Sequence, residues 1–198
     1  SNNIGTDWKE WILRSNAPTW KGDLSVSGRT NKTDYFVSLG AFNQTGVEYF
    51  SYLGRYNVRS NINVKVNDWL KVGVNITGTY QDYQTAGYST TGTGYYNPMN
   101  IAAWALPYAV PYEIKTDDSG KFIGYGEEQT YISDLGMQNY FFRMRIQPTV
   151  KNTIRSNSNM YQEITPVEGL IIRAAQAVDW YDYRYTGTVL PDENSSLT

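Results

Sequence analysis

Residues 56–80 read YNVRSNINVKVNDWLKVGVNITGTY, two runs of alternating apolar and polar side chains on either side of a turn at Asn67 to Trp69. Successive side chains of a β-strand point to opposite faces, so each run gives a strand with one apolar face and one polar face. Runs of ten or more such residues are long for a soluble strand, but they match the length that crosses a bilayer at a tilt. The pattern predicts that Tyr56 to Val66 and Leu70 to Tyr80 pair as antiparallel strands in the wall of a transmembrane β-barrel.

The aromatic content favours the same class of protein. The chain of 198 residues contains 18 Tyr, 6 Trp and 6 Phe, and its mean hydropathy is −0.52. This hydropathy argues against a helical membrane span, whereas amphipathic rings suit the aromatic girdles of an outer-membrane barrel. Composition leaves one alternative open, a soluble β-rich domain that binds glycans.

Missing residue types limit the chemistry of the chain. There is no Cys and no His, so disulfides, thiolate metal sites and a Ser-His-Asp triad are excluded. The net charge of −2 argues against nucleic acid as a partner, since an electrostatic binder needs a basic surface. We therefore expect neither an enzyme nor a protein that carries a cofactor or a metal.

The chain before residue 56 predicts a short helix and then a hairpin. Thr6 to Arg14 begins with a capping residue and ends before Pro18. Its apolar residues recur at helical spacing: Trp8, Trp11 and Ile12. Leu24 to Arg29 and Asp34 to about Gln44 alternate as strands around a polar turn.

A long loop is expected after Tyr83, because residues 85 to about 139 lack sustained alternation and are rich in Gly, Tyr, Thr, Asn and Pro. Within it, Tyr112 to Lys115 and Phe122 to Tyr125 flank the turn sequence Asp-Asp-Ser-Gly and predict a small hairpin. Barrels carry long loops on their outer face and short turns on the other, so we expect this loop at the end opposite the short turns.

A second barrel hairpin is expected near the end of the chain. Thr153 to Thr165 and Leu170 to Tyr185 form its strands, and Pro166 to Gly169 its turn. The expected organisation is a helix and lead-in over 1–19, barrel strands over 20–84, the long extracellular loop region over 85–150 and the barrel hairpin over 151–185.

Several motifs, taken in order, resemble the SusC/RagA-type TonB-dependent outer-membrane transporters of Bacteroidetes. The match is dense over Thr6 to Tyr83, weak over the loop, and recovers from about Thr153 to Trp180. The motifs are Thr6-Asp7-Trp8, Ala17-Pro18-Thr19, Leu24-Ser25-Val26-Ser27-Gly28, Lys32-Thr33-Asp34-Tyr35-Phe36-Val37-Ser38, Asn43-Gln44-Thr45-Gly46, Arg55-Tyr56-Asn57-Val58-Arg59, Asp68-Trp69-Leu70-Lys71-Val72-Gly73 and Pro166-Val167-Glu168-Gly169-Leu170.

The resemblance implies a nutrient importer of the bacterial outer membrane. Such a protein is a closed barrel in outer-membrane lipid, with a plug domain, energy input from TonB and a SusD-like surface lipoprotein as a lid; its substrates are oligosaccharides or peptides. We recognise no plug, TonB box or closing strand in this sequence, and Ser1 is not an initiator Met. The chain is therefore expected to be part of the barrel wall with one large loop.

Loop aromatics are the candidate contacts for a ligand or partner, because aromatic rings on loops stack on sugar rings. Three of them lie in the loop: Trp104, Tyr108 and Tyr112. The alternative is that they pack the loop against its neighbours. Asp117 and Asp118 invite a calcium loop, but ordinary turn chemistry explains them better. Asp179 and Asp182, with Glu127 and Glu128, invite a glycosidase site, but solvated charges explain them better.

Overall fold

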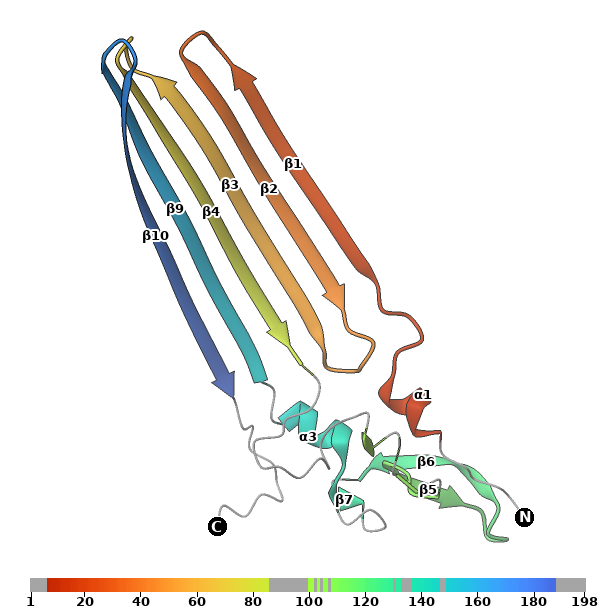
Figure 1. The fold of residues 1–198 in the computed structure, drawn as a ribbon. Coiled ribbons are helices and arrows are strands. Elements are labelled where there is room, and N and C mark those ends of the chain that lie inside the picture. Colours follow the sequence, from red (N-terminus) through yellow and green to blue (C-terminus); the bar gives the residue numbers. More distant parts are fainter. Residues whose placement is uncertain are drawn as a thin grey trace.

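One antiparallel sheet of six strands dominates the structure (Figure 1). The computed structural model describes residues 7–85, 100–101, 103, 105–106, 108–129, 131–132, 137–146 and 149–187. Among these residues no helix is long and apolar enough to cross a membrane. The strands, in their order across the sheet, are β1 (Thr19–Arg29), β2 (Thr33–Thr45), β3 (Tyr52–Lys65), β4 (Leu70–Gln84), β9 (Thr149–Val167) and β10 (Leu170–Gly187).

The pair predicted from residues 56–80 is confirmed. β3 and β4 are antiparallel neighbours, with Tyr56 opposite Tyr80 and Ile62 opposite Val74. The turn closes through the N–H of Val66, which donates to the carbonyl of Leu70 at 2.9 Å. Both strands extend beyond the predicted runs at the loop end, to Tyr52 and Gln84, whereas at the turn β3 ends at Lys65 and β4 begins at Leu70, within one residue of the prediction.

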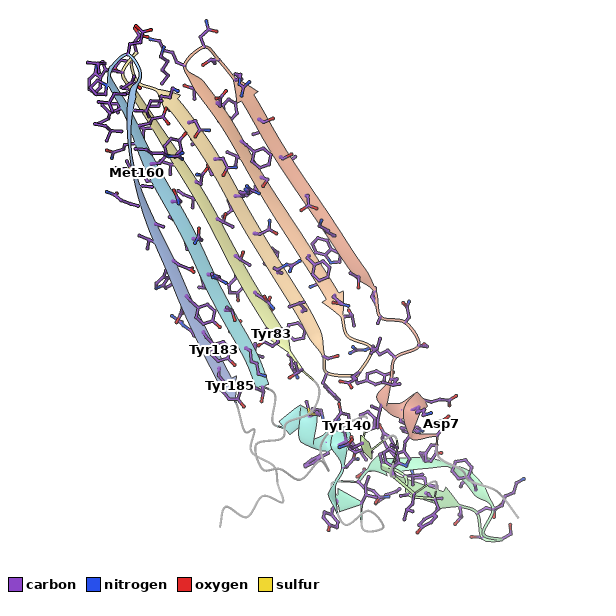
Figure 2. The ribbon with its side chains drawn as sticks, in the orientation of Figure 1. Asp7, Tyr83, Tyr140, Met160, Tyr183 and Tyr185 are labelled. Carbon is purple, nitrogen blue, oxygen red and sulfur yellow. The ribbon has the colours of Figure 1, made fainter. Side chains whose placement is uncertain are left out.

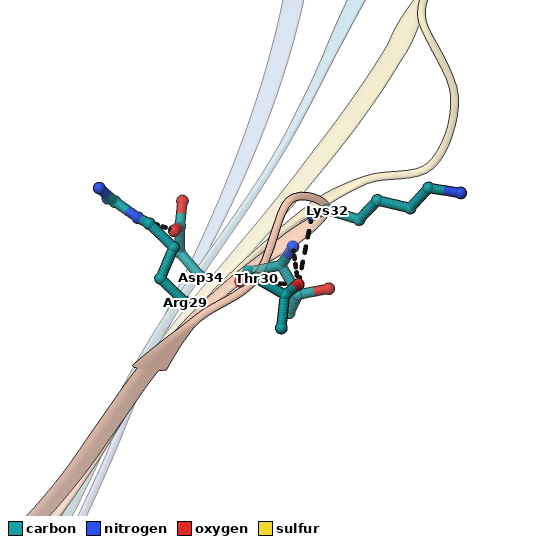
Figure 3. A network of polar contacts seen from close by, with 5 residues as sticks. Arg29, Thr30, Lys32 and Asp34 are labelled. Atoms are coloured by element: carbon teal, nitrogen blue, oxygen red, sulfur yellow. Dashed lines mark hydrogen bonds and ion pairs between the residues drawn. The ribbon is translucent and has the colours of Figure 1, made fainter.

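The other two tight turns rely on local side-chain and glycine chemistry. Figure 3 shows that Thr30 Oγ1 accepts hydrogen bonds from the backbone N–H of Lys32 at 3.2 Å and Thr33 at 3.0 Å. The β9–β10 turn is tighter than predicted, because Gly169 adopts a φ of +85° and lets β10 start at once. Pro166 belongs to β9 and not to the turn. It lies where the register of β9 against β10 shifts, and such a bulge tolerates proline, which has no backbone N–H.

The predicted helix is present but shorter. α1 (Trp8–Ile12) is capped by Asp7, whose carboxylate accepts a hydrogen bond from the N–H of Lys9 at 2.9 Å. Thr6, the expected cap, lies outside the described residues. The helix stops early because Leu13 is extended and forms a β-bridge with Glu48 in the β2–β3 connection.

The segments between β4 and β9 lie at the end of the sheet opposite the three tight turns, as predicted (Figure 1). The small hairpin is confirmed as β5 (Tyr112–Thr116) and β6 (Phe122–Glu128). β7 (Tyr131–Ile132), β8 (Met137–Gln138) and α3 (Tyr140–Ile146) follow. The sequence analysis missed α3, whose buried residues Tyr140 and Met144 are one helical turn apart.

Tyr161 packs on a glycine and connects four strands. Tyr161 of β9 lies over Gly73 of β4, so closely that a Cβ added at Gly73 would overlap its ring. The Tyr161 hydroxyl donates to Asn63 Oδ1 of β3 at 2.9 Å, and the Arg173 guanidinium of β10 lies 4.4 Å from the ring centroid. This contact fixes the register of β9 against β4, since a slip of one residue would move Tyr161 to the other face.

We predict that Gly73→Ala destabilises the intact protein by about 1–3 kcal/mol, because the added methyl group forces the Tyr161 ring off its position. Gly22→Ala is the matched control, since a Cβ at Gly22 meets nothing within 4 Å. Urea unfolding measures both. Equal stability of the two variants would contradict the proposed register lock, as would a full Gly73→Ala penalty in a Tyr161→Ala background.

Candidate functional site

The two faces of the sheet differ sharply in polarity. Residues directly opposite one another in neighbouring strands share a face, so the register assigns every side chain to one face or the other. One face is apolar, and its side chains are uncovered: Leu24 is 70% exposed and Leu39 is 52% exposed, although they lie beside other apolar side chains. The large apolar members of this face are Leu24, Val26, Tyr35, Val37, Leu39, Tyr56, Val58, Ile62, Val64, Leu70, Val72, Val74, Ile76, Tyr80, Ile154, Met160, Ile164, Ile172, Val178 and Trp180. An uncovered apolar surface of this extent is unusual for a soluble monomer.

Aromatic side chains bound the apolar face at both ends. Trp20, Tyr56 and Tyr80 lie toward the loop end, where Tyr56 and Tyr80 stack with their ring centroids 6.3 Å apart. Trp69 lies in the tight turn at the other end. The ten residue steps from Leu70 to Tyr80 rise roughly 34 Å along β4, which at a tilt of about 35–45° gives a band about 25 Å tall. This is the height of the apolar band of an outer-membrane barrel.

The opposite face is polar and suits contact with water. Arg155 forms an ion pair with Asp179 at 2.8 Å, and Lys71 one with Glu163 at 3.3 Å. Asparagines run across the face between these pairs: Asn57, Asn61, Asn63, Asn75, Asn157 and Asn159. Tyr83 and Tyr185, both opposite Lys151, and Tyr183 lie at its loop end (Figure 2). Such a face is expected on the inside of a barrel.

A small hydrophobic core joins the loop-end segments. Trp8 and Ile12 of α1 pack with Tyr140 and Met144 of α3 and with Ile101, Ala109 and Ile132. Trp8 Nε1 donates to the carbonyl of Leu106 at 3.2 Å, and the Tyr140 hydroxyl donates to the carbonyl of Tyr49 at 3.3 Å. Burial raises the pKa of Tyr140 far above its ordinary value, so this hydroxyl remains a neutral donor.

The Arg14 side chain, just after α1, binds the β2–β3 connection. Arg14 Nη1 donates to the carbonyls of Gly46 at 2.9 Å and Glu48 at 3.3 Å. Its guanidinium carbon also lies 4.9 Å from the centre of the Tyr49 ring. Burial raises the pKa of the Glu48 carboxyl. The loop-end core is thereby attached directly to the sheet.

One buried amide holds the β5–β6 hairpin to this core. Asn139 is fully buried, and its Nδ2 donates to the carbonyls of Pro111 at 2.9 Å and Gln129 at 2.7 Å. Its Oδ1 accepts from the N–H of Phe141 at 3.0 Å, which caps α3. The two carbonyls flank the hairpin, so Asn139 fixes both of its ends.

The structure describes two of the three aromatic residues predicted as contacts and gives them different surroundings. Trp104 lies outside the described residues. Tyr108 is 60% exposed. Tyr112 is half-buried, and its ring centroid lies 5.2 Å from that of Trp11 and 6.3 Å from that of Tyr125. Tyr112 therefore packs the hairpin against α1, which is the alternative that the sequence left open.

Sequence reasoning missed the rest of this aromatic cluster. Trp11 also contacts Tyr125 edge-on at 5.5 Å, and Tyr125 contacts Phe122 at 5.2 Å. Two features could have indicated this cluster. Tyr112 and Tyr125 lie on the paired strands of a predicted hairpin, and Trp11 lies outside the buried side of its helix, which Trp8 and Ile12 form. The contact between α1 and the hairpin is long-range, so no local pattern predicts it.

Three of the carboxylates considered for metal or catalytic chemistry have local partners: Asp117, Asp179 and Asp182. Asp117 accepts hydrogen bonds from the N–H groups of Ser119 and Lys121 and from Ser119 Oγ, and these bonds lower the pKa of its carboxyl. Asp179 is paired with Arg155. Among the residues that the structure describes, no group of three or more metal-binding side chains occurs. The Asp117 contacts are those of a hairpin turn.

Known proteins with similar sequences and structures are TonB-dependent outer-membrane proteins, although no family model matches the chain. TonB-dependent receptor P26 of Formosa agariphila is 28% identical over 176 residues, which are 88% of this chain and 16% of that protein. Receptor P3 of the same organism is 32% identical over 91 residues, 45% of this chain and 9% of P3.

Solved structures agree with these relatives. The RagAB peptide transporter matches 98% of this chain and 21% of its own chain, with a TM-score of 0.74 and 26% identity. The RagAB peptide importer in the open-open state covers 94% of this chain and 20% of its own, with a TM-score of 0.69 and 28% identity. The resemblance predicted from the sequence is confirmed: the chain is similar to part of TonB-dependent receptors and of the RagAB transporter, and it spans about a fifth or less of the length of these relatives.

We predict that Asn139→Leu loosens the β5–β6 hairpin from the loop-end core, because the Gln129 carbonyl loses the Asn139 donor, at a cost of about 1–3 kcal/mol, and the Pro111 carbonyl keeps only the N–H of Gln129. Hydrogen exchange of residues 111–129 should rise, while that of β3 and β4 stays unchanged. Asn157→Leu, an exposed asparagine on the polar face, is the control. Unchanged exchange in the Asn139 variant would show that the amide does not hold the hairpin.

Proposed function

We propose that this chain, as part of the barrel wall of a TonB-dependent outer-membrane protein, contributes to nutrient import without catalysing a reaction. The observation that carries the proposal is the two-faced sheet: long strands, an apolar face about 25 Å tall between aromatic ends, and a polar face behind it. Such strands can separate lipid from a hydrated lumen. The relatives named above are receptors and transporters, which agrees with a non-enzymatic role.

The orientation in the membrane follows from the two ends of the sheet. The three tight turns would face the periplasm, and the loop-end core with the β5–β6 hairpin would face outward. We assign the region 85–150 to the extracellular side, between the barrel strands of 20–84 and the hairpin of 151–185. A lid partner would then meet α1, α3 and the hairpin first.

The partners and substrates proposed are those of the transporter class. TonB would act through a plug inside the barrel, and a SusD-like lipoprotein would cover the loop end. Oligosaccharides and peptides are both candidate substrates; peptides are the first to test, because the solved relatives are described as a peptide transporter and importer. A soluble glycan-binding domain is disfavoured by the exposed apolar face.

Among the loop aromatics, Tyr108 is the best placed for contact with a ligand or lipoprotein, because its ring is largely exposed. Tyr112 would act indirectly, since its ring supports the hairpin against Trp11. Trp104 remains a proposed contact on the basis of the sequence alone.

We predict opposite solvent exposure for two adjacent residues of β4. Val74 lies opposite Ile62 and Met160 on the apolar face, and Asn75 lies opposite Asn61 and Asn159 on the polar face. In the full-length protein in lipid, a nitroxide at 74 should be relaxed by oxygen, and one at 75 by a water-soluble reagent. Val74→Lys should cost about 2–4 kcal/mol and Asn75→Lys much less.

Accessibility decides between membrane wall and soluble sheet, because Val74→Lys would also destabilise a soluble core. If neither reagent reaches the label at 74, that residue faces a protein core and the barrel-wall function is wrong.

We also predict that Tyr108→Ala weakens binding of peptide substrate or lipoprotein to the full-length transporter by several-fold, or roughly 1 kcal/mol, through loss of a stacking surface. Tyr131→Ala is the matched control, since Tyr131 is 52% exposed in the same loop-end assembly. Isothermal titration with both variants measures the effect. Equal affinities for the two variants would remove Tyr108 from the site.

A further inference from the structure

The polar face of the sheet carries an excess of positive charge. Among the strand residues, the register places nine cationic and four acidic side chains on this face, a net charge of +5, although the whole chain has a net charge of −2. Fixed charge of one sign on the inner surface of a barrel favours solutes of the opposite sign. The cations are Lys21, Arg29, Arg55, Arg59, Lys65, Lys71, Lys151, Arg155 and Arg173, and the acids are Asp23, Asp34, Glu163 and Asp179.

The acids of this face are already paired, but several of its cations are not. The four ion pairs within the face are Lys21–Asp23 at 2.8 Å, Arg29–Asp34, Lys71–Glu163 at 3.3 Å and Arg155–Asp179 at 2.8 Å. Lys65 binds Asp68 of the turn at 2.7 Å. Within the described residues, the other four cations form no ion pair with a carboxylate: Arg55, Arg59, Lys151 and Arg173. Their charge is available to an anion from outside the sheet.

Two of these four cations lie toward the loop end, and each is held over an aromatic ring. The Arg55 guanidinium carbon lies 5.2 Å from the ring centre of Phe42, its partner residue in β2. Lys151 Nζ lies 5.5 Å from the ring centre of Tyr83, its partner residue in β4. A ring attracts a cation without neutralising it. Both side chains are therefore positioned and still charged.

The spacing of the two cations suits two separate anionic groups. Arg55 and Lys151 lie two strands apart and two residues apart along the strands, so their Cα atoms are about 12 Å from each other. Gln81 and Thr153 lie between them on the same face, and Tyr183 lies opposite Thr153 (Figure 2). These three side chains offer neutral hydrogen-bonding groups around the cations.

We propose that Arg55 and Lys151 bind carboxylate groups of the substrate, so that the transporter prefers acidic substrates. This inference rests on the proposed function, because it requires the polar face to line the lumen and the loop end to be its outer entrance. Both cations lie where a substrate enters first, whereas Arg173 lies toward the tight turns. A carboxylate is an anionic group that peptides and oligosaccharides can both carry, and it pairs with Arg and Lys through charge-assisted hydrogen bonds.

The experiment uses two matched pairs of probes. A capped heptapeptide with glutamate at its second and sixth positions is compared with the same peptide carrying glutamine, since residues four apart in an extended chain are about 13 Å from each other. Trigalacturonate is compared with its methyl ester. Isothermal titration with the purified full-length transporter measures all four. The wild type should bind at least one acidic probe about three- to tenfold more tightly than its neutral counterpart.

Substitution of both cations by glutamine should remove this preference. In Arg55→Gln/Lys151→Gln, the acidic and neutral probes should differ by less than about twofold, and unchanged affinity for the neutral probe shows that the variant is folded. Arg184→Gln is the control for Lys151→Gln. Arg184 lies opposite Asn152, next to Lys151 along β9 but on the other face of the sheet, so its loss removes the same charge from outside the lumen. This control should keep the full preference.

The outcomes separate charge selection from import itself. A preference for the acidic peptide alone, or for the acidic sugar alone, supports the proposal and identifies the source of the carboxylate. Equal binding of acidic and neutral probes by the wild type overturns only the charge selection. A preference that persists in the double variant also overturns it and would assign the two cations to the plug. If no probe binds, both this inference and the proposed import of such substrates are wrong.

Discussion

Hydrogen bonding between neighbouring backbones is the constraint on which this structure depends. A bilayer interior contains no water for an unpaired N–H or C=O, so strands that cross it must pair along their whole membrane-spanning length. The ladder from β3 to β4 runs without a break from Tyr52 to Lys65, and that from β4 to β9 from Leu70 to Tyr83. Strand length, tight turns at one end and the exclusion of irregular backbone from the sheet all follow from this pairing.

The same pairing determines which face of the sheet each side chain occupies. A period of two, combined with a fixed register, collects Val74, Ile62 and Met160 on one face and Asn75, Asn61 and Asn159 on the other. The division weakens on β9 and β10, where Ser156, Ser158 and Gln176 share the apolar face.

The sequence alone predicted the features that arise locally. Alternation located β1 to β4 and β10, and turn chemistry located the hairpins, including β5–β6. It did not predict α3, since Tyr140 is buried by Trp8, Ile12 and Phe50, which lie far away in the chain. The same holds for Asn139 and for the contact of Trp11 with Tyr112. Local reasoning was wrong at Pro166, where a bulge accommodates a proline expected in the turn, and at the end of the first helix, which stops at Ile12 instead of Arg14.

The adjacency of β4 and β9 has a consequence for the order of folding. β3 and β4 are joined by a turn of a few residues, whereas β4 and β9 become neighbours only after the whole segment between Gln84 and Thr149 has been looped out. Closing a loop costs about 0.6 kcal/mol of chain entropy for each doubling of its length. We therefore expect the four-strand meander and the β9–β10 hairpin to form as separate units, with their junction as the slow, entropically costly step. The Tyr161–Gly73 contact lies across that junction, so it stabilises the step that chain connectivity disfavours most.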